Sequence, residues 1–183
     1  MEKRYEEYAY VLDFLPRGRP TRGRYRAGAI AQVIGEEYFT LLEVAVKEGE
    51  RLRPQERVYV GKKERSKITY IIGRIRYQDL STAAIAELPA VIEKIVKNRE
   101  KWFVNFFNTS QAITPRMHAL ELIPGIGKKY MWQILEEREK APFKDFEDLQ
   151  KRVNLPNPVK LLTRRILEEI SGESKYNLFT RPS

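Results

Sequence analysis

The sequence predicts an α+β protein in which a small β-barrel precedes a helical domain. Three observations support this division. The first 80 residues contain five short runs of apolar or alternating residues, separated by glycine, proline and charged turns, which is typical of strands. From residue 81 onward the apolar residues recur at helical spacing. A tight reversal interrupts this helical part at Leu122-Ile123-Pro124-Gly125-Ile126-Gly127-Lys128-Lys129.

Composition predicts a compact cytoplasmic protein with a polyanionic partner. The 183 residues are 42% hydrophobic and 32% charged, which argues against wholesale disorder and against a membrane protein. The chain has no cysteine and one histidine, so we expect no disulfide, no metal site and no cofactor. The net charge of +9 favours nucleic acid as the partner.

Five strands are predicted in the first 80 residues. They are Ala9–Leu15, Gly28–Ile34, Tyr38–Val46, Arg57–Gly61 and Ile68–Tyr77. Gly73 lies inside the last strand, and a small closed barrel uses such glycines at its tight bends while removing exposed strand edges. The arrangement resembles an OB-fold, which implies oligonucleotide binding by the sheet face and loops. An SH3-like barrel is the alternative.

Two loops of this region are strongly basic. Residues 16–26 carry five arginines and no acid, and residues 51–67 carry seven basic residues against two acidic ones. Arginine forks match phosphate geometry, so we expect these loops and the last strand to supply non-specific affinity for nucleic acid. A solvated basic turn is the alternative for residues 16–26. The candidate residues are Arg17, Arg19, Arg22, Arg24, Arg26, Lys62, Lys63, Arg74 and Arg76.

The segment from Ser81 to Asn108 is predicted to be helical, with a break at Pro89. Ser81 or Thr82 is the expected cap of the first helix. Four aromatic side chains extend the apolar stripe, and we expect them in a core that joins the two domains rather than on a base-stacking surface. They are Trp102, Phe103, Phe106 and Phe107.

The reversal at residues 122–129 is predicted to form a phosphate site. We expect a helix over Pro115–Leu122, capped by Thr114, and a second helix from Lys128 to Arg138. Glycine permits the tight turn, and Gly127 leads directly into a helix start, where free N–H groups favour an anion. The predicted contacts are Gly125, Ile126, Gly127, Lys128 and Lys129.

These residues resemble a helix-hairpin-helix, a motif that grips nucleic-acid backbone without reading bases. Residues 142–149 resemble the linker and third helix of paired helix-hairpin-helix domains, with Asp145 as a cap. The partner hairpin, Asn154–Pro158, lacks the glycines, so it is degenerate and a second phosphate site is in doubt. Asn157 and Pro158 open the last predicted helix, which ends at Ser171-Gly172. A hairpin that only packs helices is the alternative.

Barrel and hairpin together resemble an uncharacterised archaeal family of predicted RNA- or DNA-binding proteins. This resemblance implies an archaeal cytoplasm and a nucleic-acid role, without an established activity. We therefore predict a barrel at residues 1–80, a helical connector at 81–110, a paired helix-hairpin-helix domain at 111–172 and a tail at 173–183.

The favoured function is non-catalytic binding of RNA or DNA backbone, with no catalytic residue assigned. One alternative is a DNA glycosylase or lyase, because some of these enzymes place a catalytic lysine where Lys129 stands, with an aspartate downstream such as Asp145 or Asp148. A second alternative is an interaction module that binds a ribosome or repair complex through Trp102, Trp132 or the tail. We expect His118 to have a structural or solvent-facing role.

Overall fold

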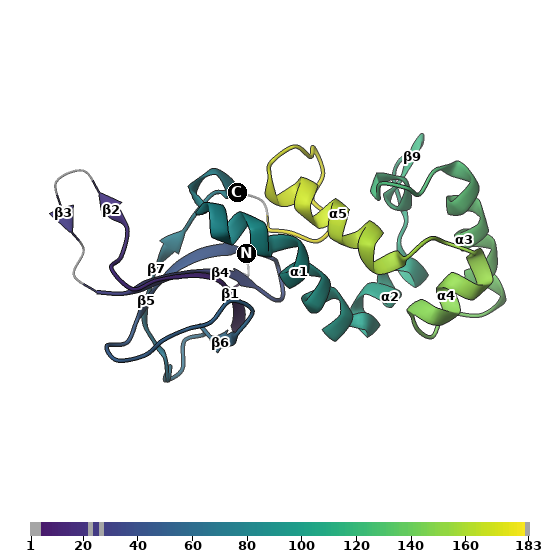
Figure 1. Ribbon diagram of the computed structural model, residues 1–183. Coiled ribbons are helices and arrows are strands. Elements are labelled where there is room, and N and C mark those ends of the chain that lie inside the picture. Colours follow the sequence, from purple (N-terminus) through teal and green to yellow (C-terminus); the bar gives the residue numbers. More distant parts are fainter. Residues whose placement is uncertain (1–4, 22–23, 26–27, 182–183) are drawn as a thin grey trace. The chain divides into compact units, whose positions relative to one another are not determined.

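The computed structural model describes residues 5–21, 24–25 and 28–181 (Figure 1). The chain forms two compact units. Unit 1 contains the chain up to Val91 together with the segment from Glu169 onward, and unit 2 is Ile92–Glu168. Strands dominate unit 1 and helices dominate unit 2, so the predicted α+β class is confirmed. The predicted division at residues 80, 110 and 172 stays a prediction.

Unit 1 is built on a five-stranded antiparallel sheet that curls into a half-barrel. The sheet order is β6-β1-β4-β5-β7, so β6 and β7 are its edges in the described part of the chain. Alternate residues such as Val11, Val33 and Val44 fill the inner core, as the period-2 pattern requires. The strands are β1 (Tyr8–Leu15), β4 (Ile30–Gly35), β5 (Leu41–Val46), β6 (Arg57–Tyr59) and β7 (Ile68–Arg74).

Several predicted boundaries in unit 1 are wrong. The strand predicted from Tyr38 begins only at Leu41, because Phe39 has a left-handed backbone with φ 54°. The last strand ends at Arg74 instead of Tyr77, and a 3-10 helix, η1 (Tyr77–Asp79), follows it. The predicted basic loop contains a separate two-stranded ribbon of β2 (Pro20–Thr21) and β3 (Arg24–Tyr25) (Figure 1).

Gln32 ties the sheet to the start of the first helix. Its side chain is 1% exposed, and its amide nitrogen donates to Glu43 Oε2 at 3.2 Å and to the Asp79 carbonyl at 3.1 Å. Its amide oxygen accepts from the Ser81 N–H at 2.9 Å. The Ser81 hydroxyl in turn donates to Asp13 at 2.6 Å and accepts from the Ala84 N–H at 3.1 Å. Ser81 is therefore the cap, as predicted.

Two buried carboxylates fix backbone segments of unit 1. Glu6 accepts from the N–H groups of Glu37 and Tyr38, at 3.1 and 2.7 Å, which holds the β4–β5 turn. Glu169 accepts from the N–H groups of Leu178, Phe179 and Thr180 at 3.0 to 3.1 Å. A carboxylate surrounded by N–H donors is a strong, directional anchor. The C-terminal tail is therefore docked in unit 1.

The first helix, α1 (Thr82–Asn98), is continuous through Pro89, so the predicted break at this proline is wrong. Proline removes one hydrogen bond, but Leu88, Val91 and Ile92 beside it are completely buried. Tertiary packing of this kind outweighs local propensity. The break lies at Arg99, which has φ −114° and ψ 35°, and α2 (Glu100–Thr109) follows.

The helix predicted over Pro115–Leu122 is also wrong. This segment forms a small hairpin of β8 (Ala112–Thr114) and β9 (Met117–His118), followed by a 3-10 turn, η2 (Ala119–Leu122). The His118 ring accepts from the Leu120 N–H at 3.1 Å, and Glu121 accepts from the His118 N–H at 2.9 Å. These side chains compete with the backbone bonds of a helix.

Three helices complete the chain, and their starts and ends agree closely with the sequence pattern. They are α3 (Lys128–Lys140), α4 (Phe146–Val153) and α5 (Pro158–Ile170). Asp145 accepts from the Asp148 N–H at 2.7 Å, so its predicted capping role is confirmed. Within the described ranges, no helix combines the length and the apolar character needed to span a bilayer.

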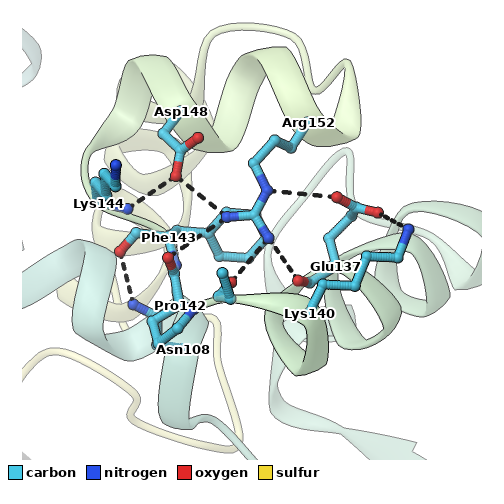
Figure 2. Close-up of polar contacts among 9 residues, drawn as sticks. Asn108, Glu137, Lys140, Pro142, Phe143, Lys144, Asp148 and Arg152 are labelled. Atoms are coloured by element: carbon cyan, nitrogen blue, oxygen red, sulfur yellow. Dashed lines mark hydrogen bonds and ion pairs between the residues drawn. The ribbon is translucent and has the colours of Figure 1, made fainter.

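Arg152 connects α4 to the end of α3 in unit 2 (Figure 2). Its guanidinium donates to the backbone carbonyls of Glu137, at 2.5 Å, and Ala141, at 2.8 Å. It also contacts the carboxylates of Glu137, at 3.3 Å, and Asp148, at 3.2 Å. The same group lies 4.5 Å from the centre of the Phe143 ring. One side chain thus binds two carbonyls at the end of α3, of which that of Glu137 also accepts from the Ala141 N–H at 3.3 Å.

We expect Arg152→Lys to lower the free energy of unfolding by about 2–3 kcal/mol, because an ammonium cannot reproduce a planar fork with several partners. Urea denaturation measures the change. The control is Lys151→Ala on the same helix, whose ion pair with Glu147 has both side chains 75% exposed. Such an exposed pair contributes less than about 0.5 kcal/mol. Equal effects of the two substitutions would contradict a central role for Arg152.

Candidate nucleic-acid interface

The turn between η2 and α3 is anchored by two buried isoleucines. Ile123 is completely buried and Ile126 is 2% exposed, and the Ile126 N–H donates to the Ile123 carbonyl at 3.0 Å. Gly125, between them, has φ +92°, which favours glycine. A Cβ on Gly125 would also lie 2.8 Å from Leu161 on α5. The isoleucines therefore fix the turn in the core, and Gly125 is required by the fold.

Gly127 differs from Gly125 both in its backbone conformation and in the space available for a side chain. Its φ of −87° is open to any residue, and a Cβ added there would meet nothing within 4 Å. Gly127 is the N-cap of α3, and no side chain caps this helix. By contrast, Ser81 and Asp145 cap α1 and α4 with their own oxygens. Among the described residues, the first N–H groups of α3 thus lack a side-chain acceptor, and the space above Gly127 is open.

The two lysines after Gly127 have different surroundings. Both are exposed. Lys128 Nζ lies 2.9 Å from Glu121 Oε1, an ion pair between η2 and α3. The His118 N–H and then the Lys128 ammonium lower the pKa of Glu121. No ion pair of Lys129 is found in the described part of the chain, so its charge adds to the positive end of the helix dipole.

The second turn, between α4 and α5, has no comparable opening. Asn154 ends α4 in the left-handed conformation, with φ 58°, and Leu155 is 1% exposed. The Asn157 side chain accepts from the Lys160 N–H at 3.4 Å, at the start of α5. An acceptor from the chain itself is therefore already present at the start of α5.

The predicted arginine loop lies partly outside the described residues. Arg22 and Arg26 belong to that undescribed part, and Arg24 is described only by its backbone in β3. Arg17 is exposed. Arg19 donates to the Asp79 carbonyl and lies 3.6 Å from Glu43 Oε2, so its guanidinium is held against the body of unit 1.

The remaining predicted cations of unit 1 are spread over the loop before β7, the end of β7 and the start of η1. Lys62 Nζ lies 4.5 Å from the centre of the Tyr5 ring, while Lys63 is exposed. Arg74 donates to the Arg181 carbonyl at 2.8 Å, and Arg76 pairs with Asp79 at 3.3 Å. Lys62 and Arg74 line one cavity of unit 1, whereas Lys63 and Arg76 do not.

The two aspartates considered for catalysis, and also His118, have structural contacts. Asp145 caps α4, and Asp148 accepts from the Lys144 N–H at 3.0 Å (Figure 2). That N–H, followed by the Arg152 side chain, lowers the pKa of Asp148. His118 is the cap of η2, and burial followed by the charge of Arg138 lowers its pKa. Among the described residues, no three histidine or acidic side chains are arranged to hold a metal ion.

The structure places further residues beside the predicted ones. Arg65, Arg181 and the buried Thr40 line the same cavity as Lys62 and Arg74. The position of Arg181 depends on tail docking by Glu169 and on the contact with Arg74, which is 107 residues away and has no local signal in the sequence. In unit 2, Trp132 is 62% exposed and lies on α3 about one helical turn after Lys128.

Comparisons with known proteins agree on one family. The model of a family described as "Protein of unknown function (DUF655)" matches residues 5–181. Uncharacterized protein MJ0038 of Methanocaldococcus jannaschii is 42% identical over 181 residues, which cover 98% of this chain and 82% of that protein. The crystal structure of Af1531 from Archaeoglobus fulgidus, also assigned to DUF655, superposes with a TM-score of 0.88 at 52% identity, covering 96% of this chain and 100% of that one. The chain therefore belongs to the DUF655 family.

Proposed function

We propose that the protein binds the phosphate backbone of RNA or DNA, with little base specificity and without catalysis. The observation that carries the proposal is the N-terminus of α3, which no side chain in the described part of the chain caps and above which Gly127 leaves open space. Backbone N–H groups at such a position bind phosphate oxygens, and Lys129 adds an exposed positive charge. The net charge of +9 favours approach of a polyanion.

The proposal treats the hairpin of unit 2 as helix-hairpin-helix-like and the half-barrel of unit 1 as OB-like. In support, Gly125 and the two buried isoleucines give the turn a fixed shape ahead of α3. The 3-10 turn η2 stands where the motif has a full helix. On the barrel side, the five strands β6-β1-β4-β5-β7 form an incomplete ring with cationic residues near its open edges.

Replacing Lys129 tests the electrostatic part of the proposal. We expect Lys129→Gln to weaken binding of single- and double-stranded oligonucleotides of any sequence. One lost phosphate contact should also reduce the slope of log affinity against log salt by about 0.7 to 0.9. Fluorescence anisotropy over a salt series measures this slope. Arg164→Gln, at an exposed position on α5, is the matched control, and equal slopes for both variants would count against the proposal.

Gly127→Asp separates binding from stability, because the two are expected to change in opposite directions. The backbone at Gly127 already has the extended conformation of a cap, and a side chain fits there. The new carboxylate should accept the free N–H groups of α3 and stabilise the protein by about 0.5–1 kcal/mol. The same carboxylate should repel phosphate and reduce affinity about tenfold or more.

Thermal unfolding and anisotropy are measured on the same Gly127→Asp samples. Gly127→Asn supplies a cap without a charge, so it should raise stability similarly and reduce affinity less. If Gly127→Asp is more stable and binds oligonucleotides as tightly as the unmodified chain, the hairpin serves only to pack helices.

A further inference from the structure

Unit 1 contains a cavity at its open end. The cavity has a volume of about 690 Å³, within the range of roughly 300–1,000 Å³ that is typical of small-ligand sites. It is lined by residues from both sides of the gap between the edge strands, including Gly61 after β6 and Ile71 on β7. Leu42, Val60 and Ile71 line it with apolar side chains that belong to the inner core or pack against it. The cavity is thus the place where the half-barrel stays open.

Leu42, Val60 and Ile71 form a short apolar floor of the cavity, and four cationic residues line the cavity beside it. They are Lys62, Arg65, Arg74 and Arg181. Arg74 donates to the backbone carbonyl of Arg181 at 2.8 Å, which brings the two residues together. Burial, and after it the positive charge of Arg181, lowers the pKa of Arg74. An anion bound beside both guanidinium groups would relieve this repulsion, and guanidinium forks match phosphate oxygens.

A buried hydroxyl in the same cavity has no partner. Thr40 is 4% exposed and lines the cavity, and its Oγ1 has no hydrogen-bond partner in the described structure. This oxygen has almost no surface open to the cavity, but buried polar groups are rarely left unsatisfied, so a ligand atom that reaches the hydroxyl would supply its missing partner. The backbone around Thr40 is already fixed, because Glu6 holds the N–H groups of Glu37 and Tyr38.

We propose that this cavity binds a nucleoside phosphate, either free or at the end of a strand. Its phosphate lies against Arg74 and Arg181, and its base lies on the apolar floor with a hydrogen bond to Thr40. A long acyl chain fits poorly, because the floor is short and the wall also contains the carboxylates of Glu7 and Glu37. Those carboxylates are acceptors for the hydroxyl or amino groups of a nucleoside.

The site is separate from the proposed phosphate contact at the start of α3, since its residues belong to unit 1 and the hairpin to unit 2. Isothermal titration calorimetry of the full chain with the four nucleoside 5′-monophosphates tests it. At least one is expected to bind about tenfold or more tightly than its nucleoside and than inorganic phosphate. Binding of none of the four, or equal binding of inorganic phosphate, would overturn the proposal.

Thr40→Val is the most informative variant. Valine has nearly the shape of threonine, and it removes a hydroxyl that makes no bond, so thermal stability should be unchanged or higher. Affinity for the monophosphate should fall about tenfold, because the polar atom of the base loses its partner. Unchanged affinity in this variant would show that the hydroxyl does not face the ligand and would overturn the assignment.

Arg181→Gln tests the phosphate contact, with Arg164→Gln as the control. The substitution keeps the backbone carbonyl that receives Arg74, so the tail contact survives. Affinity for the monophosphate should fall at least tenfold, while affinity for the nucleoside stays the same. Equal loss for both ligands would mean that the variant disturbs the cavity and not the phosphate contact, which would contradict the proposed placement.

Two further measurements are needed. The first distinguishes a free nucleotide from the end of a strand, and the second distinguishes binding at the cavity from binding at the hairpin. A 5′-phosphorylated trinucleotide that binds as tightly as the monophosphate indicates a strand end, and one that binds about tenfold more weakly indicates a free nucleotide. Lys129→Gln should leave monophosphate affinity unchanged even where it weakens oligonucleotide binding. Loss of monophosphate binding in Lys129→Gln would move the site to the hairpin and overturn the proposal for the cavity.

Discussion

The guanidinium of Arg152 is the contact on which the geometry of unit 2 depends. It joins the last turn of α3, the linker that follows and α4 through one planar group (Figure 2). Asn108 adds a second connection, because its side chain accepts from the Phe143 N–H at 2.7 Å and donates to the Phe143 carbonyl at 3.0 Å. Most of these bonds end on backbone atoms, so they fix the path of the chain whatever side chains it carries. The orientation of α3, and hence of its N-terminus, follows from them.

Unit 2 treats its helix ends in two ways. Asp145 and Asn157 satisfy the starts of α4 and α5 with oxygens from the chain. Among the described residues, the starts of α2 and α3 have no such oxygen, and at α3 the space for one is present at Gly127. A side-chain cap at Gly127 would add stability, so the protein is less stable without it than it could be. Surfaces that exchange stability for an open polar group are typical of binding sites.

Elements that depend on neighbouring residues in the sequence could be predicted, whereas elements that depend on tertiary packing could not. The cap at Asp145, the end of α5 near Gly172 and the turn at Gly125 each depend on residues within a few positions, and the sequence pattern indicates all three. The continuity of α1 through Pro89 depends on buried neighbours, and propensity alone favours a break there. Likewise, Glu121 and His118 form a compact turn where apolar spacing suggests a helix. The cavity was not predictable, because it joins residues as far apart as Tyr5 and Arg181.

The tail anchored by Glu169 gives unit 1 a discontinuous origin in the chain. Residues up to Val91 form most of it, but the segment from Glu169 onward completes it. During synthesis the chain emerges from its amino end, and compact regions fold as their residues become available. Unit 2, which is continuous in sequence, has therefore left the ribosome entirely before Glu169 and the tail follow. A nascent chain whose half-barrel has already emerged still lacks Arg181, so the wall of the cavity is completed only after unit 2 has emerged.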